Sequence, residues 1–177
     1  MIRLFAAIAV PEEIGESLTH RMHGLEGARW RPLEALHITL RFFGDVAEPM
    51  ADDIDSELSA IAMPPFGVTL ETVGAFGEGR DIHAVWAGVA DSAPLRHLAA
   101  KSETGARRAG MKAETRAYRP HVTLAYLRRP DPGAVARWIQ THNLLKSAPF
   151  GVDRFGLYSS HQTSEGSRYV LEREYRL

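Results

Sequence analysis

The chain has 177 residues, 45% of them hydrophobic and 24% charged, and a net charge of −1, which is typical of one globular domain with a substantial core. It has no cysteine, which excludes disulfides, thiolate metal sites and a cysteine nucleophile. No apolar run is long enough to span a membrane, and Pro11-Glu12-Glu13 ends the first one too early for a signal peptide. We therefore expect a cytoplasmic protein with no membrane segment.

The charges are unevenly distributed along the chain. Residues 1–88 contain 6 Arg and no Lys against 14 acidic residues, a balance of −8. Residues 89–177 contain 15 basic and 8 acidic residues, a balance of +7. This asymmetry predicts opposed lobes, with the basic one meeting a phosphate chain. Arginine supplies 18 of the 21 basic residues, which either suits bidentate phosphate recognition or reflects coding composition.

Hydrophobic periodicity and chain breakers predict the same order of elements twice. In the first half we expect strands over residues 2–10, 35–43 and 66–75, a helix that starts at Pro11 and extends to Leu25, and a helix over about 49–61. In the second half we expect strands over 82–89, 119–127 and 150–159, and helices over 94–109 and 130–141. Residues 167–177 add a final strand. The repetition predicts a duplicated α+β fold, a single two-lobed domain over 1–177 with halves of about 1–78 and 79–177.

One short motif occurs once in each half. It reads Leu36-His37-Ile38-Thr39-Leu40 in the first half and Pro120-His121-Val122-Thr123-Leu124 in the second. Because side chains alternate along a strand, the histidine and threonine of each copy share one face and the aliphatic residues share the other. A single copy is weak evidence of a site, but two copies in equivalent places predict a pair of strands that line one central cleft.

Paired histidines and threonines suit acid-base chemistry on an anion. Histidine changes charge near neutral pH, so His37 and His121 can hold opposite protonation states and act as base and acid. The hydroxyls of Thr39 and Thr123 can hold the oxygens of a tetrahedral group. A phosphodiester fits both requirements. The other six histidines have no such pattern, and we expect them to be structural or solvated.

With these motifs the chain resembles the RNA 2',3'-cyclic phosphodiesterases, also called 2'-5' RNA ligases, the LigT-like branch of the two-histidine phosphoesterases. The likeness also covers Arg3-Leu4-Phe5-Ala6-Ala7-Ile8, the run Arg41-Phe42-Phe43-Gly44-Asp45-Val46, Arg119-Pro120 and a late strand with Tyr169. The resemblance implies two antiparallel sheets around a cleft with helices outside. It also implies metal-independent hydrolysis of 2',3'-cyclic phosphate RNA ends to 2'-phosphate, and reversible ATP-independent 2'-5' ligation, with tRNA halves among the possible substrates.

One position departs from the family pattern. Many relatives have a phosphate-binding arginine where this chain has Tyr126. Arg41, which has the parity of His37 and Thr39, is our first candidate for the missing cation, and Arg128 is the second. Phe43, Trp30 and Tyr126 are candidates for stacking on a nucleobase, although each also suits packing.

Several alternatives remain open at this point. One alternative keeps the chemistry with a small cyclic nucleotide or ADP-ribose cyclic phosphate as the substrate. The other is a protein that binds RNA ends without catalysis. A metal hydrolase is disfavoured because two histidines without a carboxylate motif make a poor ligand set, so no cofactor is expected. The near symmetry of the motifs leaves the base and the acid unassigned. A small enzyme with its own cleft is expected to be a monomer.

Overall fold

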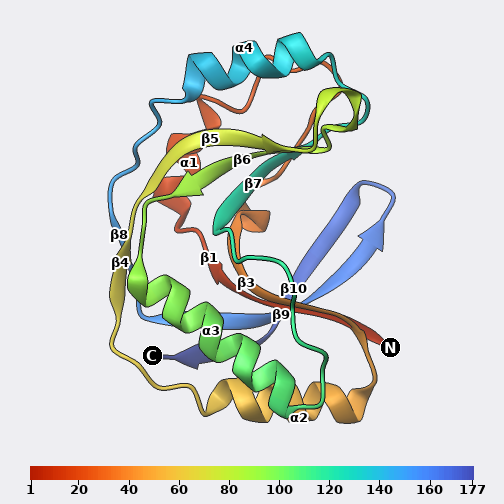
Figure 1. Cartoon of the computed structure of the whole chain (residues 1–177), viewed down its shortest axis with the longest axis vertical. Coiled ribbons are helices and arrows are strands. Elements are labelled where there is room, and N and C mark those ends of the chain that lie inside the picture. Colours follow the sequence, from red (N-terminus) through yellow and green to blue (C-terminus); the bar gives the residue numbers. More distant parts are fainter.

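A computed structural model describes all residues 1–177 (Figure 1). Its helices are α1 (Glu12–Thr19), α2 (Glu48–Ser59), α3 (Ala93–Arg108) and α4 (Pro132–His142), with short 3₁₀ turns at Leu33–Ala35 and Gly79–Asp81. Its strands are β1 (Ile2–Ala9), β2 (Arg29–Trp30), β3 (His37–Val46), β4 (Phe66–Val68), β5 (Leu70–Phe76), β6 (Ala84–Val89), β7 (His121–Tyr126), β8 (Phe150–Val152), β9 (Arg154–Thr163) and β10 (Gly166–Arg176). No helix is both long and apolar enough to cross a membrane.

Eight of the strands form one antiparallel sheet in the order β10-β9-β1-β3-β7-β6-β5, with β2 beside β7. The sheet has two four-stranded halves, because β3 and β7 pair at only one position, Ile38 with Val122. In Figure 1 the half with β5, β6 and β7 lies above and the half with β1, β3, β9 and β10 lies below. Strands β4 and β8 form a separate two-stranded sheet. The predicted pair of antiparallel sheets is thus present as two halves that meet at one residue pair.

The two halves of the sequence exchange strands. Strand β5, from the first half of the chain, pairs with β6 of the second half. Strand β9, from the second half of the chain, pairs with β1 of the first. Neither half of the sheet is therefore built from one half of the sequence, and the prediction of opposed acidic and basic lobes is wrong.

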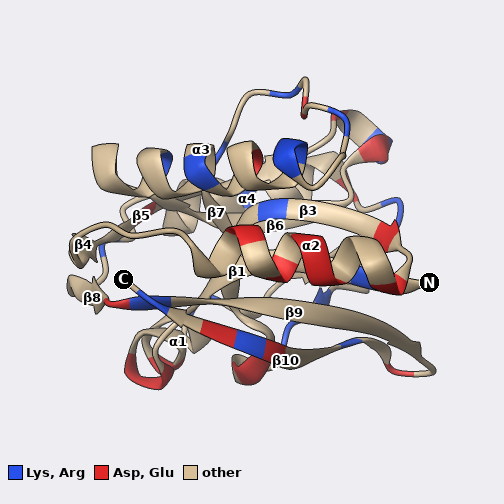
Figure 2. Ribbon diagram, turned by 90° about the horizontal axis from the view of Figure 1, so that it is seen from below, with Lys and Arg blue, Asp and Glu red and all other residues tan.

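Some of the unevenly distributed charges instead pair between the two halves of the sequence. Figure 2 shows acidic residues along α2, next to α3 and β10. Arg108 of α3 lies 3.7 Å from Glu57 of α2, and Arg173 of β10 lies 3.5 Å from Asp55. Part of the charge asymmetry therefore appears as ion pairs between the two halves of the sequence.

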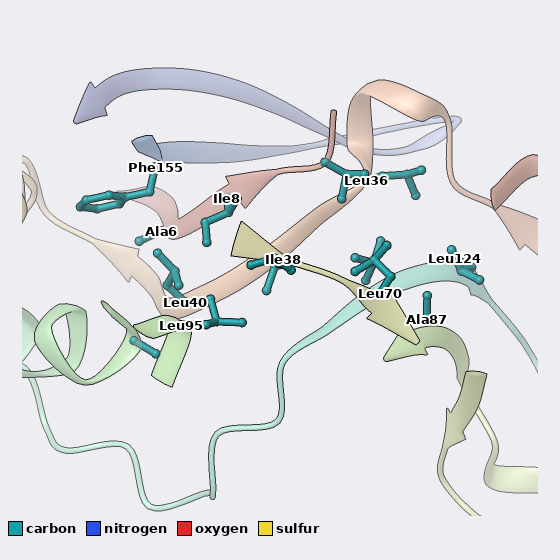
Figure 3. Close-up of a cluster of buried hydrophobic side chains, with 14 of the residues drawn as sticks. Ala6, Ile8, Leu36, Ile38, Leu40, Leu70, Ala87, Leu95, Leu124 and Phe155 are labelled. Atoms are coloured by element: carbon teal, nitrogen blue, oxygen red, sulfur yellow. The ribbon is translucent and has the colours of Figure 1, made fainter. Parts of the chain in front are cut away.

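One core cluster joins the sheet to the helices. It contains 37 buried hydrophobic residues, including side chains from α1, α2, α3 and α4 and from both halves of the sheet. Figure 3 shows Ile38 near its middle, with Leu40 and Leu95 on one side and Leu70 and Leu124 on the other. The aliphatic residues of both motifs thus face the core, as their alternation predicts.

Most predicted elements are present with shifts of a few residues at their ends. Helix α1 is shorter than predicted and ends at Thr19, although Leu25 is still buried. The predicted strand over 66–75 is divided into β4 and β5. Within β5, Thr72 has a positive φ of 62° where the pairing register with β6 shifts. The predicted strand over 150–159 is likewise divided into β8 and β9.

Candidate active site

The single pairing between β3 and β7 brings the two motifs together. Ile38 lies opposite Val122 in antiparallel register, and both side chains are fully buried in the core. Opposed residues of an antiparallel pair point to the same face, so their neighbours along each strand point to the other face. That face, here called the motif face, carries His37, Thr39, His121 and Thr123, all of them partly exposed.

The two histidine rings are held in the same way. The Nδ1 atom of His37 lies 2.8 Å from the carbonyl oxygen of Ala35, and that of His121 lies 2.6 Å from the carbonyl oxygen of Arg119. A carbonyl oxygen can only accept, so each Nδ1 carries the proton and donates it. In the neutral ring, Nε2 then has the free lone pair that a general base needs, and in the charged ring it has the proton that a general acid gives.

Aromatic rings surround both imidazoles. The His37 ring centroid lies 4.9 Å from that of Phe5 and 5.2 Å from that of Tyr169. The His121 ring centroid lies 4.7 Å from that of Phe76, and the indole of Trp86 lies farther away at 6.4 Å. These contacts fix the rings and remove water from around them. Sequence reasoning missed this aromatic surround, because its members come from four different strands.

This surround changes the acidity of both histidines. Burial, aided by the charges of Arg31 and His121, lowers the pKa of His37 to about 4, although its bond to Ala35 opposes the shift. Burial also lowers the pKa of His121, opposed by its bond to Arg119. Both imidazoles are therefore biased toward the neutral form in the free protein. The charge effect of His121 on His37 is a further sign that the two rings share one site.

A β-bulge follows the first motif and reverses the parity of the strand. Thr39 pairs with Ala7, but Arg41 pairs with Ala6, so Leu40 is an additional residue. Because Ala6 belongs to the core cluster, Arg41 points to the helix side of the sheet. The prediction that Arg41 shares the face of His37 and Thr39 is wrong for this reason.

The guanidinium of Arg41 is already paired. Its Nε lies 2.6 Å from Glu103 of α3, and its Nη1 lies 3.7 Å from Glu114 in the segment that leads to β7. Nη2 donates to the carbonyl oxygen of Lys112 at 3.0 Å. Arg41 therefore ties α3 and this segment to β3 instead of facing an anion on the motif face.

Two of the three aromatic candidates also lie away from the motif face. A second bulge in β3 leaves Phe43 buried in the core, only 5% exposed. Trp30 pairs with Ala125, packs against the core and lies 6.0 Å from the ring of Trp138. The predicted base-stacking roles of Phe43 and Trp30 are therefore contradicted by their positions.

Tyr126 is the candidate that reaches the motif face. In β7, Thr123 pairs with Trp86 and Ala125 with Val85, so a bulge at Leu124 follows the second motif as one follows the first. After this bulge, Tyr126 lies on the motif side with 39% of its surface exposed. Arg128 lies beyond the end of β7 and is exposed, without a contact that relates it to the histidines.

Sequence reasoning missed the arginine that does lie near the site. Arg31 is buried, at 8% exposure, and its guanidinium carbon lies 5.5 Å from the ring centroid of Tyr126. No periodic signal in the sequence distinguishes Arg31 from a solvated arginine. No three side chains among His, Cys, Asp and Glu are grouped as metal ligands would be.

Two H-x-T strands that meet on one face of an antiparallel sheet define a site of the two-histidine phosphoesterase class. The family model of the 2'-5' RNA ligase superfamily matches residues 10–164. The chain belongs to this superfamily, and the family resemblance seen in its motifs is confirmed.

Individual relatives match over nearly their whole length. The chain is 29% identical over 171 residues to the RNA 2',3'-cyclic phosphodiesterase of Archaeoglobus fulgidus, covering 95% of this chain and 96% of that protein. It is 30% identical over 177 residues to the protein of the same name from Escherichia coli K12, covering 95% and 92%. The crystal structure of E. coli LigT complexed with 3'-AMP superposes with a TM-score of 0.80 at 27% identity, covering 99% of this chain and 98% of that one. The predicted fold class is thereby confirmed.

Proposed function

We propose that this protein is an RNA 2',3'-cyclic phosphodiesterase, which opens the cyclic phosphate at the end of an RNA to leave a 2'-phosphate. The observation that carries the proposal is the antiparallel meeting of the two motifs at Ile38 and Val122. It gives one face two imidazoles with free Nε2 atoms and two threonines. The names of the full-length relatives support the same activity.

The reaction follows from these groups. A neutral imidazole takes a proton from water at Nε2 while the water oxygen attacks phosphorus. The bond between phosphorus and O3' breaks, and the other imidazole, in its protonated form, gives its Nε2 proton to O3'. The hydroxyls of Thr39 and Thr123 donate to the non-bridging oxygens, where negative charge increases in the transition state. The products are a 2'-phosphate and a 3'-hydroxyl, and no metal ion takes part.

Ligation uses the same step with a different nucleophile. When the 5'-hydroxyl of a second RNA replaces water, attack on phosphorus and departure of O3' form a 2'-5' phosphodiester. The step needs no ATP because the cyclic phosphate is the activated group, and it is reversible because the same bonds can exchange back. RNA halves with a cyclic phosphate end, such as tRNA halves, are the substrates that this chemistry would join. The chain carries both histidines and both threonines and would act as a monomer.

The test is turnover of an RNA oligonucleotide with a 2',3'-cyclic phosphate end, measured in EDTA. His37→Gln and His121→Gln each remove one titrating group and should lower kcat/KM by about 10²- to 10⁴-fold. His20→Gln, at an exposed position after α1, is the matched control and should leave kcat/KM unchanged. Thr39→Val and Thr123→Val test the hydroxyls with little change of shape. ³¹P NMR of the product distinguishes a 2'-phosphate from a 3'-phosphate.

The possible outcomes separate the alternative functions. Loss of activity in both histidine variants with a 2'-phosphate product supports the whole proposal. Turnover of small 2',3'-cyclic nucleotides or ADP-ribose cyclic phosphate but not of RNA would keep the chemistry and reject RNA as the substrate. Binding of the RNA end by the wild type without turnover would indicate a binding protein and reject catalysis.

A further inference from the structure

Arg31 is unusual among the arginines of this chain because it is buried without an acidic partner. Only 8% of its surface is exposed, yet no carboxylate lies within ion-pair distance of its guanidinium. Arg41, whose side chain is 10% exposed, has two carboxylates around it. A buried charge is costly unless it is paired. Arg31 is therefore a buried cation without a counter-ion from the protein.

The backbone directs Arg31 to the motif face. Strand β2 runs beside β7, with Arg29 opposite Tyr126 and Trp30 opposite Ala125. The N–H of Arg31 continues this pairing by donating to the carbonyl oxygen of Leu124 at 2.8 Å. Since Trp30 packs on the core, alternation turns Arg31 to the side of Tyr126.

Two tyrosines and one carbonyl hold the guanidinium in place. Its carbon lies 5.5 Å from the ring centroid of Tyr126 and 5.4 Å from that of Tyr169, in cation-π contact with both. Nη2 donates to the carbonyl oxygen of Ser167 at 3.0 Å. These contacts use only part of the five N–H groups of the side chain. The rest are available to an anion.

Arg31 also lies close to a catalytic histidine. The ring of Tyr169, which contacts the guanidinium, is edge-on to the ring of His37 at 5.2 Å. After burial, which is the largest cause, the charge of Arg31 is one of the effects that lower the pKa of His37. The fixed cation and the imidazole thus belong to one site.

We propose that Arg31 is the phosphate-binding cation of this site, and that it contacts the non-bridging oxygens of the cyclic phosphate beside His37. The proposal rests on the proposed function for the identity of the substrate, but the anion-binding role depends only on the contacts above. A planar guanidinium held between two rings is positioned for two parallel hydrogen bonds to a phosphate. Arg31 then does what sequence reasoning sought from Arg41 or Arg128.

The experiment titrates the protein with inorganic phosphate and follows the imidazole signals of His37 and His121 by NMR. Arg31→Met fills the space between the rings without a charge, and Arg31→Lys keeps the charge but loses the planar donor pair. Arg107→Met makes the same charge change at an exposed position of α3, and it is the matched control. Thermal melting of each variant checks that it is folded.

We expect Arg31→Met to bind phosphate about 10- to 100-fold more weakly than the wild type, the effect of losing a hydrogen-bonded charge. Arg31→Lys should lie between them, and Arg107→Met should match the wild type. The KM for the cyclic-phosphate RNA should rise in the same order. A folded Arg31→Met variant with wild-type phosphate affinity would overturn the proposal.

The two proposals fail in different ways. If the wild type binds phosphate through Arg31 but does not turn over the RNA, the phosphodiesterase function is rejected and the anion-binding role of Arg31 stands. If the wild type turns over the RNA and Arg31→Met has an unchanged KM, the role of Arg31 is rejected and the function stands.

Discussion

Protonation of His37 should make the protein lose stability as the pH falls, by an amount that the structure sets. Burial among aromatic rings lowers the folded-state pKa of His37 from 6.5 to about 4. Below pH 6.5 the unfolded chain binds this proton and the folded chain does not, so the free energy of unfolding falls between pH 6.5 and pH 4. At about 1.4 kcal/mol for each pKa unit the whole shift is worth about 3.5 kcal/mol, of which about 3 kcal/mol is lost by pH 4.

The assay is urea unfolding followed by tryptophan fluorescence at pH 7, 5.5 and 4. Other groups titrate over this range, so the wild type is compared with His37→Gln, which keeps every other titrating group. We expect the wild type to lose about 3 kcal/mol more than the variant between pH 7 and pH 4. Equal losses in the two proteins would refute the argument that the folded state keeps His37 neutral.

Three further predictions concern activity and packing. The pH profile of kcat/KM reports the pKa values of the free enzyme, and both histidine pKa values are lowered. The bell-shaped profile of kcat/KM should therefore have its maximum below pH 6.5. A maximum above pH 7 would contradict this. Arg41→Met should lower the free energy of unfolding by about 2 kcal/mol, which is less than for a fully buried pair because Glu103 and Glu114 are partly exposed. The same substitution should leave KM within about twofold of the wild-type value. A large rise in KM at unchanged stability would show that Arg41 belongs to the site after all. Gly74→Ala puts a Cβ 2.4 Å from the Trp86 ring, and it should lower the free energy of unfolding by about 1–3 kcal/mol and also lower kcat. Gly67→Ala, where a Cβ would have no atom within 4 Å, should change neither quantity. Urea unfolding and turnover measure the two effects.

Local patterns were sufficient to predict the elements and the two motifs. The alternation around His37 and His121 shows which residues face the core, because burial of Ile38 and Val122 requires it. The same alternation failed four residues after His37. A bulge depends on how a strand pairs with its neighbour, here β3 with β1. The leucine at position 40 gives no local sign of a bulge. The side chain of Arg41 therefore points to the opposite face of the sheet from the one predicted.

The position of Arg31 could not be predicted for a related reason. Its contacts come from β7 and from β10, and Ser167 is 136 residues away in the chain. Before Pro32, an arginine in a short extended piece looks like any solvated arginine. Only the tertiary arrangement, in which the β9–β10 hairpin extends toward the other half of the sheet (Figure 1), makes it a buried cation. For similar reasons, no local sequence pattern predicts that β5 pairs with β6 and β9 with β1, across the two halves of the sequence. The distribution of charge in the folded protein depends on these pairings.

The single pair between Ile38 and Val122 raises the question of what fixes the two histidines relative to each other. One residue pair is a weak connection between the two halves of the sheet. Other elements also connect the two halves. Helix α3 follows β6 of one sheet half in sequence and packs on β3 of the other. Strands β4 and β8 pair in a second, small sheet, and Arg31, beside β7, donates to Ser167 of β10. Turning of one half of the sheet relative to the other would strain or break these links. The exchange of strands between the two halves of the sequence thus holds together a site in which each half supplies one histidine and one threonine.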